Sequence, residues 1–166
     1  MTRRGFMAQS VALGAGIALN AKELDGQSKR LIALLPLIAA VQEHMFPPQS
    51  SLPSASQMNM SGFLQETIMH QSYDKDIRRF VIEGAQELHN RTSGKFIAMT
   101  QEQKERALRR YEQSDYGSNW LSRIMTLGME ALFSDPIYGS NINEAGWRST
   151  GSEGGMPRPA VRYIAL

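Results

Sequence analysis

Three histidines are the side chains in this chain best suited to binding a metal ion or transferring a proton. They are His44, His70 and His89. Each falls in a different predicted helix, and no second histidine follows any of them three or four residues later. Metal sites need several donors that converge on one point. The spacing therefore predicts no metal site.

Carboxylates and nucleophiles offer little more chemistry. Glu43 beside His44, and Glu130 near Asp135, are combinations that could serve as an acid and a base. Charged side chains on helices usually face solvent, so neither pair predicts a catalytic site. The chain has no cysteine, which excludes thiolate nucleophiles, thiolate metal ligands and covalently attached haem.

Two glycine-rich stretches resemble nucleotide-binding loops only in part. Gly14-Ala15-Gly16 begins like a dinucleotide fingerprint, but Leu19 occupies the third glycine position and no predicted strand precedes it. Gly154-Gly155 lacks the lysine of a phosphate-binding loop. We therefore expect a non-catalytic chain that holds no cofactor, and that binds neither FAD nor a metal ion when purified alone.

The charge of the chain is concentrated at its start. The net charge is +2, and no charged residue other than Arg3 and Arg4 precedes Lys22. The sequence beyond Ala21 thus carries 16 basic and 16 acidic side chains. Nucleic-acid binding depends on clustered basic side chains, so we expect no nucleic-acid partner.

Residues 1–21 have the layout of an export signal. Arg3 and Arg4 are followed by Phe6, and the run from Ala8 to Ala21 carries no charge. Val11 to Leu19 is about half the length that a membrane-spanning helix needs. Adjacent arginines before a weakly hydrophobic run resemble the twin-arginine signal, which exports folded proteins. The alternative is a basic terminus that leads into an apolar helix.

The fate of this signal stays open in the sequence. Ala21 suits the position before a cleavage site, whereas Leu19 stands where a small residue is preferred. Cleavage after Ala21 and retention of the signal are both compatible with this pattern. In either case the export signal predicts a periplasmic protein.

Residues 22–133 are predicted to form an all-α domain, a small bundle of about five helices. Apolar residues recur at helical spacing, and no stretch shows the two-residue alternation of a strand. The helices are expected near residues 31–46, 61–68, 74–88, 100–113 and 118–133.

Local signals place the ends of these helices. Asp74 is a suitable N-cap, and Thr100 with Gln103 has the spacing of a capping box. Ser61 is predicted to cap the short second helix. Pro36 either begins or kinks the first.

The last predicted helix is apolar around much of its circumference, so it should be central. Met125 and Met129, four residues apart on this helix, are interpreted as core filling.

Residues 134–166 are predicted to be a long irregular C-terminal segment. Five glycines and three prolines fall within these 33 residues and disfavour regular structure. The segment also contains Tyr138 and Trp147, and disordered tails are poor in such residues. It should pack either in the groove of a partner or over its own bundle, and the sequence does not choose between them.

An ordered set of motifs resembles the small third subunit of gluconate 2-dehydrogenase and of related FAD-dependent sugar dehydrogenases. The motifs are Trp120-Leu121, Met129-Glu130-Ala131-Leu132-Phe133, Asp135-Pro136-Ile137-Tyr138-Gly139, Asn141, Gly146-Trp147 and Gly154-Gly155-Met156-Pro157-Arg158-Pro159. Weaker support comes from Phe46-Pro47-Pro48 and Ser61-Gly62-Phe63-Leu64. Ser140 stands where the family typically has glycine.

The resemblance implies a role inside a complex. A large FAD-containing subunit would oxidise a sugar, sugar acid or alcohol, and a multihaem cytochrome c subunit commonly passes the electrons to quinone. The small subunit would supply the twin-arginine signal and support maturation of the large one. It would meet the membrane only through the complex, at the outer face of the bacterial inner membrane.

Partner contacts are expected in the tail, at Asp135, Pro136, Tyr138, Gly139, Trp147, Pro157 and Arg158. Two other function classes stay open. One is a free-standing exported helical binding protein whose tail packs on itself. The other is a small exported enzyme, which would need a histidine or carboxylates converging in a pocket.

Overall fold

A computed structural model describes residues 25–162, and all regular structure in this part of the chain is helical. The α-helices cover residues 25–45 (hereafter the first helix), α2 Met60–Met69, α3 Lys75–Arg91, α4 Gln101–Glu112, α5 Asp115–Phe133 and α6 Ala145–Thr150. Three single 3-10 turns complete them: η1 Phe96–Ala98, η2 Pro136–Tyr138 and η3 Ile142–Glu144. The predicted all-α class is confirmed.

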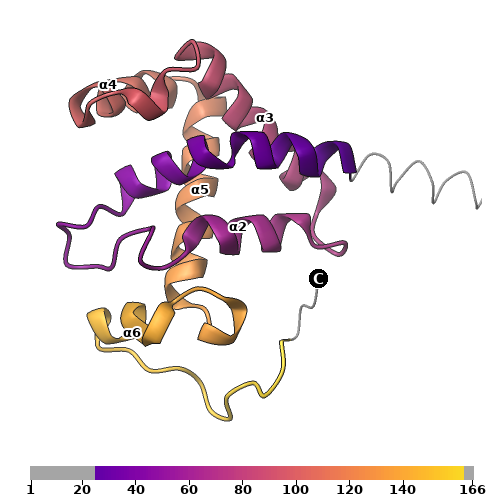
Figure 1. The fold of residues 1–166 in the computed structure, drawn as a ribbon, viewed down its shortest axis with the longest axis vertical. Helices are drawn as coiled ribbons and strands as arrows, with labels where there is room; N and C mark the ends of the chain where they lie inside the picture. The colour runs from indigo at the N-terminus through magenta and orange to yellow at the C-terminus, as the bar shows by residue number, and fades with distance from the viewer. Residues whose placement is uncertain (1–24, 163–166) are drawn as a thin grey trace, which may run out of the picture.

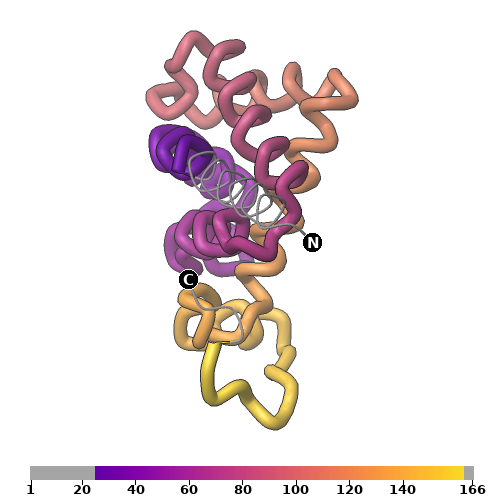
Figure 2. Tube along the Cα trace, turned by 90° about the vertical axis from the view of Figure 1, so that its right-hand side faces the viewer, coloured from indigo at the N-terminus to yellow at the C-terminus, as the bar shows by residue number. Residues whose placement is uncertain are grey.

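Helix α5 forms the axis of the molecule, as its apolar pattern predicted. It runs the length of the fold in Figure 1, with α3 and α4 at one end and α6 at the other. It contacts α2, α3, α4 and α6. The first helix and α2 both lie on one side of α5 in Figure 2. The other helices of the bundle therefore pack around α5, in contrast to a four-helix bundle, in which the four helices are equivalent.

Capping side chains explain where several helices begin. Asp74 accepts hydrogen bonds from the backbone N–H groups of Asp76 and Ile77. Thr100 forms the predicted capping box with Gln103. Both satisfy N–H groups that have no partner inside a helix.

Three predicted helix starts are corrected. Helix α2 begins after Asn59 and contains Ser61, so Ser61 is not its N-cap. Helix α5 begins after Ser114, earlier than expected, because the Ser114 side chain accepts from the N–H of Gly117. Of the two alternatives at Pro36, a helix start is wrong, because residues on both sides are helical, and a kink stays a prediction.

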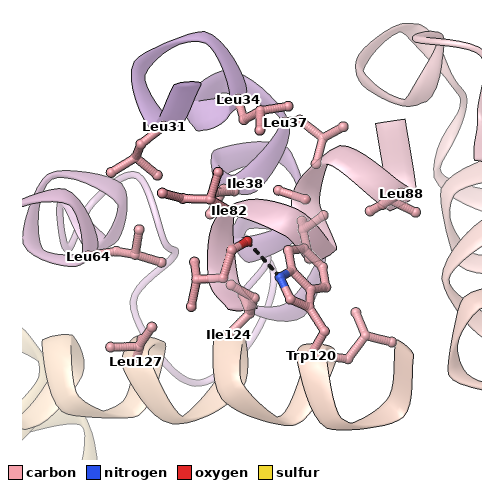
Figure 3. Packing of buried hydrophobic residues seen from close by; sticks show 14 of the residues in the cluster. Leu31, Leu34, Leu37, Ile38, Leu64, Ile82, Leu88, Trp120, Ile124 and Leu127 are labelled. Carbon is pink, nitrogen blue, oxygen red and sulfur yellow. Dashed lines mark hydrogen bonds between the residues drawn. The ribbon is translucent and has the colours of Figure 1, made fainter. Parts of the chain in front are cut away.

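The main core joins the first helix to α2, α3, α4 and α5. Figure 3 shows leucine and isoleucine side chains from the first helix, α2, α3 and α5 packed between the helices, with the indole of Trp120 at one side of the cluster. The fully buried members include Leu31, Ile38, Leu64 and Ile124. A second cluster, near the C-terminal end of α5, contains Phe46, Met58, Met60 and Leu132. The two clusters together bury one face of α5 over most of its length.

Trp120 fixes the approach of α5 to α3. A Cβ atom built on Gly84 would lie only 2.0 Å from Cδ1 of Trp120. The indole N–H donates to the carbonyl of Val81 at 2.9 Å, and the Tyr111 hydroxyl donates to the carbonyl of Gly84 at 3.0 Å. Only glycine leaves room for this packing, because any side chain would occupy the space of the indole.

A buried arginine of α3 binds the C-terminal end of α2. Arg78 is only 3% exposed, and its guanidinium donates to the carbonyls of Ile68 and His70. These carbonyls belong to the C-terminal turn of α2, where the helix dipole favours a positive charge. Arg78 therefore links α3 to the end of α2 through backbone groups.

We predict that Gly84→Ala lowers the free energy of unfolding by about 2 to 3 kcal/mol, because the added methyl group overlaps Trp120. Gly26→Ala is the matched control, since a Cβ atom there meets nothing within 4 Å. It should cause no loss and a gain of up to about 1 kcal/mol from helix propensity. Denaturant unfolding of both variants measures the difference, and equal stabilities would contradict this view of the α3–α5 contact.

Candidate functional site at the C-terminal end of α5

The tail is more ordered than its composition predicted. Residues 136–150 contain η2, η3 and α6, so the expectation that glycine and proline would exclude regular structure from the whole tail is corrected. Residues 152–162 do lack regular structure. The physical reason is that several of these residues suit helix ends: Gly139 and Gly151 end η2 and α6 with φ values of 81° and 66°, and Pro136 is the first residue of η2.

Asn141 and Trp147 cap the end of α5. The buried Asn141 amide donates to the carbonyl of Ser134 at 2.9 Å and accepts from the N–H of Gly146 at 2.8 Å. The Trp147 indole donates to the carbonyl of Phe133 at 2.8 Å. Carbonyls at a helix end need such partners. The tail therefore begins by supplying the C-terminal cap of the central helix.

Arg158 holds the outer part of the tail against this cap. Its guanidinium lies over the Trp147 ring, 4.5 Å from the ring centre. It also donates to Asp135 at 2.7 Å and to Glu144 at 3.1 Å. A Cβ on Gly154 would lie 2.5 Å from the indole, so the chain here passes directly against Trp147. Three predicted site residues, Asp135, Trp147 and Arg158, thus form one cluster.

The other predicted tail residues lie apart from this cluster. Tyr138 lines an apolar groove of about 460 Å³ together with Phe63 and Phe133. Pro136 opens η2, where its fixed φ suits the first position of a helix. Pro157 is exposed. The structure therefore places three of the seven predicted residues in a self-packed cluster and Tyr138 on a groove wall, while Pro136, Gly139 and Pro157 belong to neither.

Trp147 is only 7% exposed and its N–H is bonded within the chain. Its burial is the packing expected for a tail that folds over its own bundle. The proposed contact of Trp147 with a partner remains a prediction, and it would require this cluster to open.

Electrostatics favour the closed cluster. The pKa of Asp135 is lowered, first by the hydrogen bond from the N–H of Ile137 and then by Arg158. The pKa of Arg158 is raised, mainly by its hydrogen bond to Asp135. Both groups are therefore ionised over the whole neutral range, and the ion pair persists there.

The predicted acid–base pairs are not formed. Glu43 accepts from the N–H of Ser56, whereas His44 turns to α4 and bonds Glu105 at 2.7 Å and Gln101 at 2.9 Å. The hydrogen bond from His44 lowers the pKa of Glu105. The sequence analysis missed Glu105, because it is 61 residues from His44 and the pair exists only once the helices pack.

Both ring nitrogens of His44 are occupied by these partners. The ring borders a second cavity of about 440 Å³, yet no nitrogen is left to take a proton from a ligand there. His70 follows α2 as its C-cap residue and bonds Ser72. Within residues 25–162, no three histidine or carboxylate side chains gather as metal ligands do.

The family comparison covers nearly all of this architecture. A family model described as gluconate 2-dehydrogenase subunit 3 matches residues 35–155. The chain belongs to the gluconate 2-dehydrogenase subunit 3 family. Comparison with curated proteins and with solved structures gave no significant match. The resemblance stated from the tail motifs is thus confirmed.

Family membership makes this chain one of the subunit 3 proteins, which are components of a dehydrogenase complex. The match runs from within the first helix to the glycine pair that precedes Arg158. The predicted signal residues Arg3, Arg4 and Phe6 lie outside both the match and the described residues. Among residues 25–162, no helix has the length and hydropathy needed to cross a bilayer.

We predict that Trp147→Ala in this subunit 3 protein lowers the free energy of unfolding by about 3 to 5 kcal/mol, the usual cost of removing a large buried ring. Trp147→Phe keeps an aromatic ring but loses the donor to Phe133 and part of the indole's packing, so it should cost less, about 1 to 3 kcal/mol. Thermal and denaturant unfolding measure both. A stable Trp147→Ala variant would show that the cluster is not part of the folded core.

The Asp135–Arg158 pair predicts a pH dependence. Because the folded state lowers the pKa of Asp135, its contribution to stability is present above the unfolded value of about 3.9 and is lost as pH falls through the lower folded value. Asp135→Asn should therefore flatten the acid limb of a stability–pH curve relative to wild type. Parallel curves would contradict the lowered pKa of Asp135.

Proposed function

We propose that this protein is the non-catalytic small subunit of an FAD-dependent sugar, sugar-acid or alcohol dehydrogenase complex. The observation that carries the proposal is the family match over residues 35–155, which contains most of the helical bundle and, of the tail cluster, Asp135 and Trp147. FAD would reside in the large catalytic subunit, and haem c in a third subunit where one is present. This chain would contribute export, maturation and stability rather than chemistry.

The arrangement of titratable groups supports a non-catalytic role. His44 borders a cavity, but both of its nitrogens are held by Glu105 and Gln101. The ionised carboxylate of Asp135 accepts hydrogen bonds from Arg158 and from the backbone N–H of Ile137. Catalytic acids and bases need a free position within hydrogen-bond reach of a substrate, and these groups do not offer one.

The export role rests on Arg3, Arg4 and Phe6. A signal for folded proteins is useful when the cargo must acquire its cofactor before it crosses the membrane. A chain that has no evident cofactor motif, yet carries such a signal, is suited to delivering a flavin-containing partner. The complex would then act in the periplasm, at the outer face of the inner membrane.

One observation favours the second candidate, a free-standing exported binding protein. That reading expects the tail to pack on its own bundle, and Trp147 does so. The two functions differ in whether a flavin-containing chain copurifies with the native protein. The family match favours the subunit, because subunit 3 is named as part of a larger enzyme.

We expect replacement of Arg3 and Arg4 together by Lys to block export of both this chain and its dehydrogenase partner. Lysine keeps the charge and removes the guanidinium pair of the signal. Periplasmic and cytoplasmic fractions should be assayed for dehydrogenase activity and for this chain.

Lys22→Arg is the control, because it changes a basic residue just beyond the predicted signal. It should leave both fractions as in wild type. Normal periplasmic dehydrogenase activity in the double variant would refute the carrier role, while loss of both proteins from the periplasm would support it.

A further inference from the structure

An apolar stripe on the outer face of α5 is exposed in the part of the chain that the structure describes. Met125, Met129 and Phe133 follow one another at four-residue spacing, and they are 38%, 38% and 39% exposed. Residues four apart lie on one side of a helix, so these three form a continuous stripe. The expectation that Met125 and Met129 fill the core is therefore wrong. The core face of α5 is already filled by Trp120, Leu127 and their neighbours.

Two hollows adjoin this stripe at its ends. The cavity of about 440 Å³ beside His44 includes Leu121 and Met125. The groove of about 460 Å³ near the end of the helix includes Phe63, Phe133 and Tyr138. A helix that is central to the fold yet has an apolar, hollowed outer face is typical of a protein-binding surface. We call the stripe and this groove the α5 docking face.

Two carboxylates mark the edge of the groove, and they differ in their partners. Glu66 pairs with Arg162 of the tail at 3.0 Å, and the same guanidinium donates to the carbonyl of Ile137. An arginine from residues 152–162, which lack regular structure, therefore already binds at the edge of the groove. The carboxylate of Glu130, which also lines the groove, makes no hydrogen bond or ion pair with any residue from 25 to 162.

We propose that the α5 docking face binds the FAD-containing catalytic subunit of the complex. The partner would present an apolar side chain to the groove, next to an arginine or lysine that pairs with Glu130. The partner's cation follows from the charge of the groove edge, where Glu66 is paired with Arg162 while Glu130 is paired with no cation among residues 25–162. The inference rests on the proposed function, and it identifies the surface through which this subunit would bind its catalytic partner.

The stripe is well suited to this use. Methionine is flexible and polarizable, so it adapts to an opposing surface at little cost in strain. Phe133 and Tyr138 add aromatic area, which dominates the energetics of many interfaces. The self-packed cluster of Trp147 and Arg158 would not need to open, because the face lies outside it. The tail then serves the interface by holding η2, and with it Tyr138, against the end of α5.

The test uses the tagged full-length chain, expressed in its own bacterium in place of the untagged copy. The complex is recovered through the tag, and flavin retained per tagged chain is measured by absorbance. Met129→Glu should reduce retained flavin at least about tenfold, since it places a charge in an apolar interface beside Glu130. Ile97→Glu is the matched control: Ile97 is 52% exposed and lies on η1, outside the face, so retention should match wild type.

A second pair of variants tests the charge. Glu130→Lys should lower retention strongly, and Glu130→Gln should lower it less. The difference between wild type and Glu130→Gln should shrink when the wash is raised from low to high salt, because salt screens the ion pair. Thermal unfolding of each purified chain verifies that the variants are folded, as expected for substitutions at exposed positions.

The outcomes separate the two levels of the proposal. If wild type retains flavin and folded Met129→Glu and Glu130→Lys retain as much, the docking face is wrong and the subunit role stands. If wild type itself retains no flavin chain, the proposed function fails and the docking face falls with it. If light scattering shows that the isolated wild type is a dimer and Met129→Glu is a monomer, the face binds a second copy and the proposal is overturned.

Discussion

The indole of Trp120 lies directly on the backbone of α3, and the main core of the bundle includes this contact. Gly84 allows the approach, and hydrogen bonds from Trp120 and Tyr111 to the carbonyls of Val81 and Gly84 hold it. Packing of this kind is stiff, because protein interiors have little free volume. With α3 fixed on α5, Arg78 then fixes the end of α2 through its carbonyls. The first helix completes the core over these elements.

This arrangement gives α5 three distinct regions. Its inner face is buried in the core, its C-terminal end is capped by the tail, and its outer face carries Met125, Met129 and Phe133 to the surface. Most family motifs in the tail belong to the cap: Asn141, Trp147 and Arg158 bond or stack within it. The cap holds the end of the central helix and so shapes the groove beside it. In a subunit that acts by association, a rigid surface of this type limits the entropy lost on binding.

The elements that the sequence predicted well are those with local causes. Asp74 and Thr100 cap helices through N–H groups two or three residues away, so their roles depend on no other part of the chain. Ser61 failed as a cap because α2 starts one residue before it, a shift that local pattern does not resolve. Met125 and Met129 were assigned to the core because their spacing shows which residues share a face, but not which face is covered.

The sequence by itself determined the all-α class, the central place of α5, and the family, since helical periodicity and ordered motifs are written along the chain. Only the tertiary structure decided which groups meet. His44 bonds Glu105 instead of acting with its neighbour Glu43, Arg158 returns across 23 residues to Asp135, and Trp147 closes on α5. Those pairings depend on how helices pack in space, and a solvent-facing and a core-facing methionine look the same in sequence until the neighbouring helices are placed.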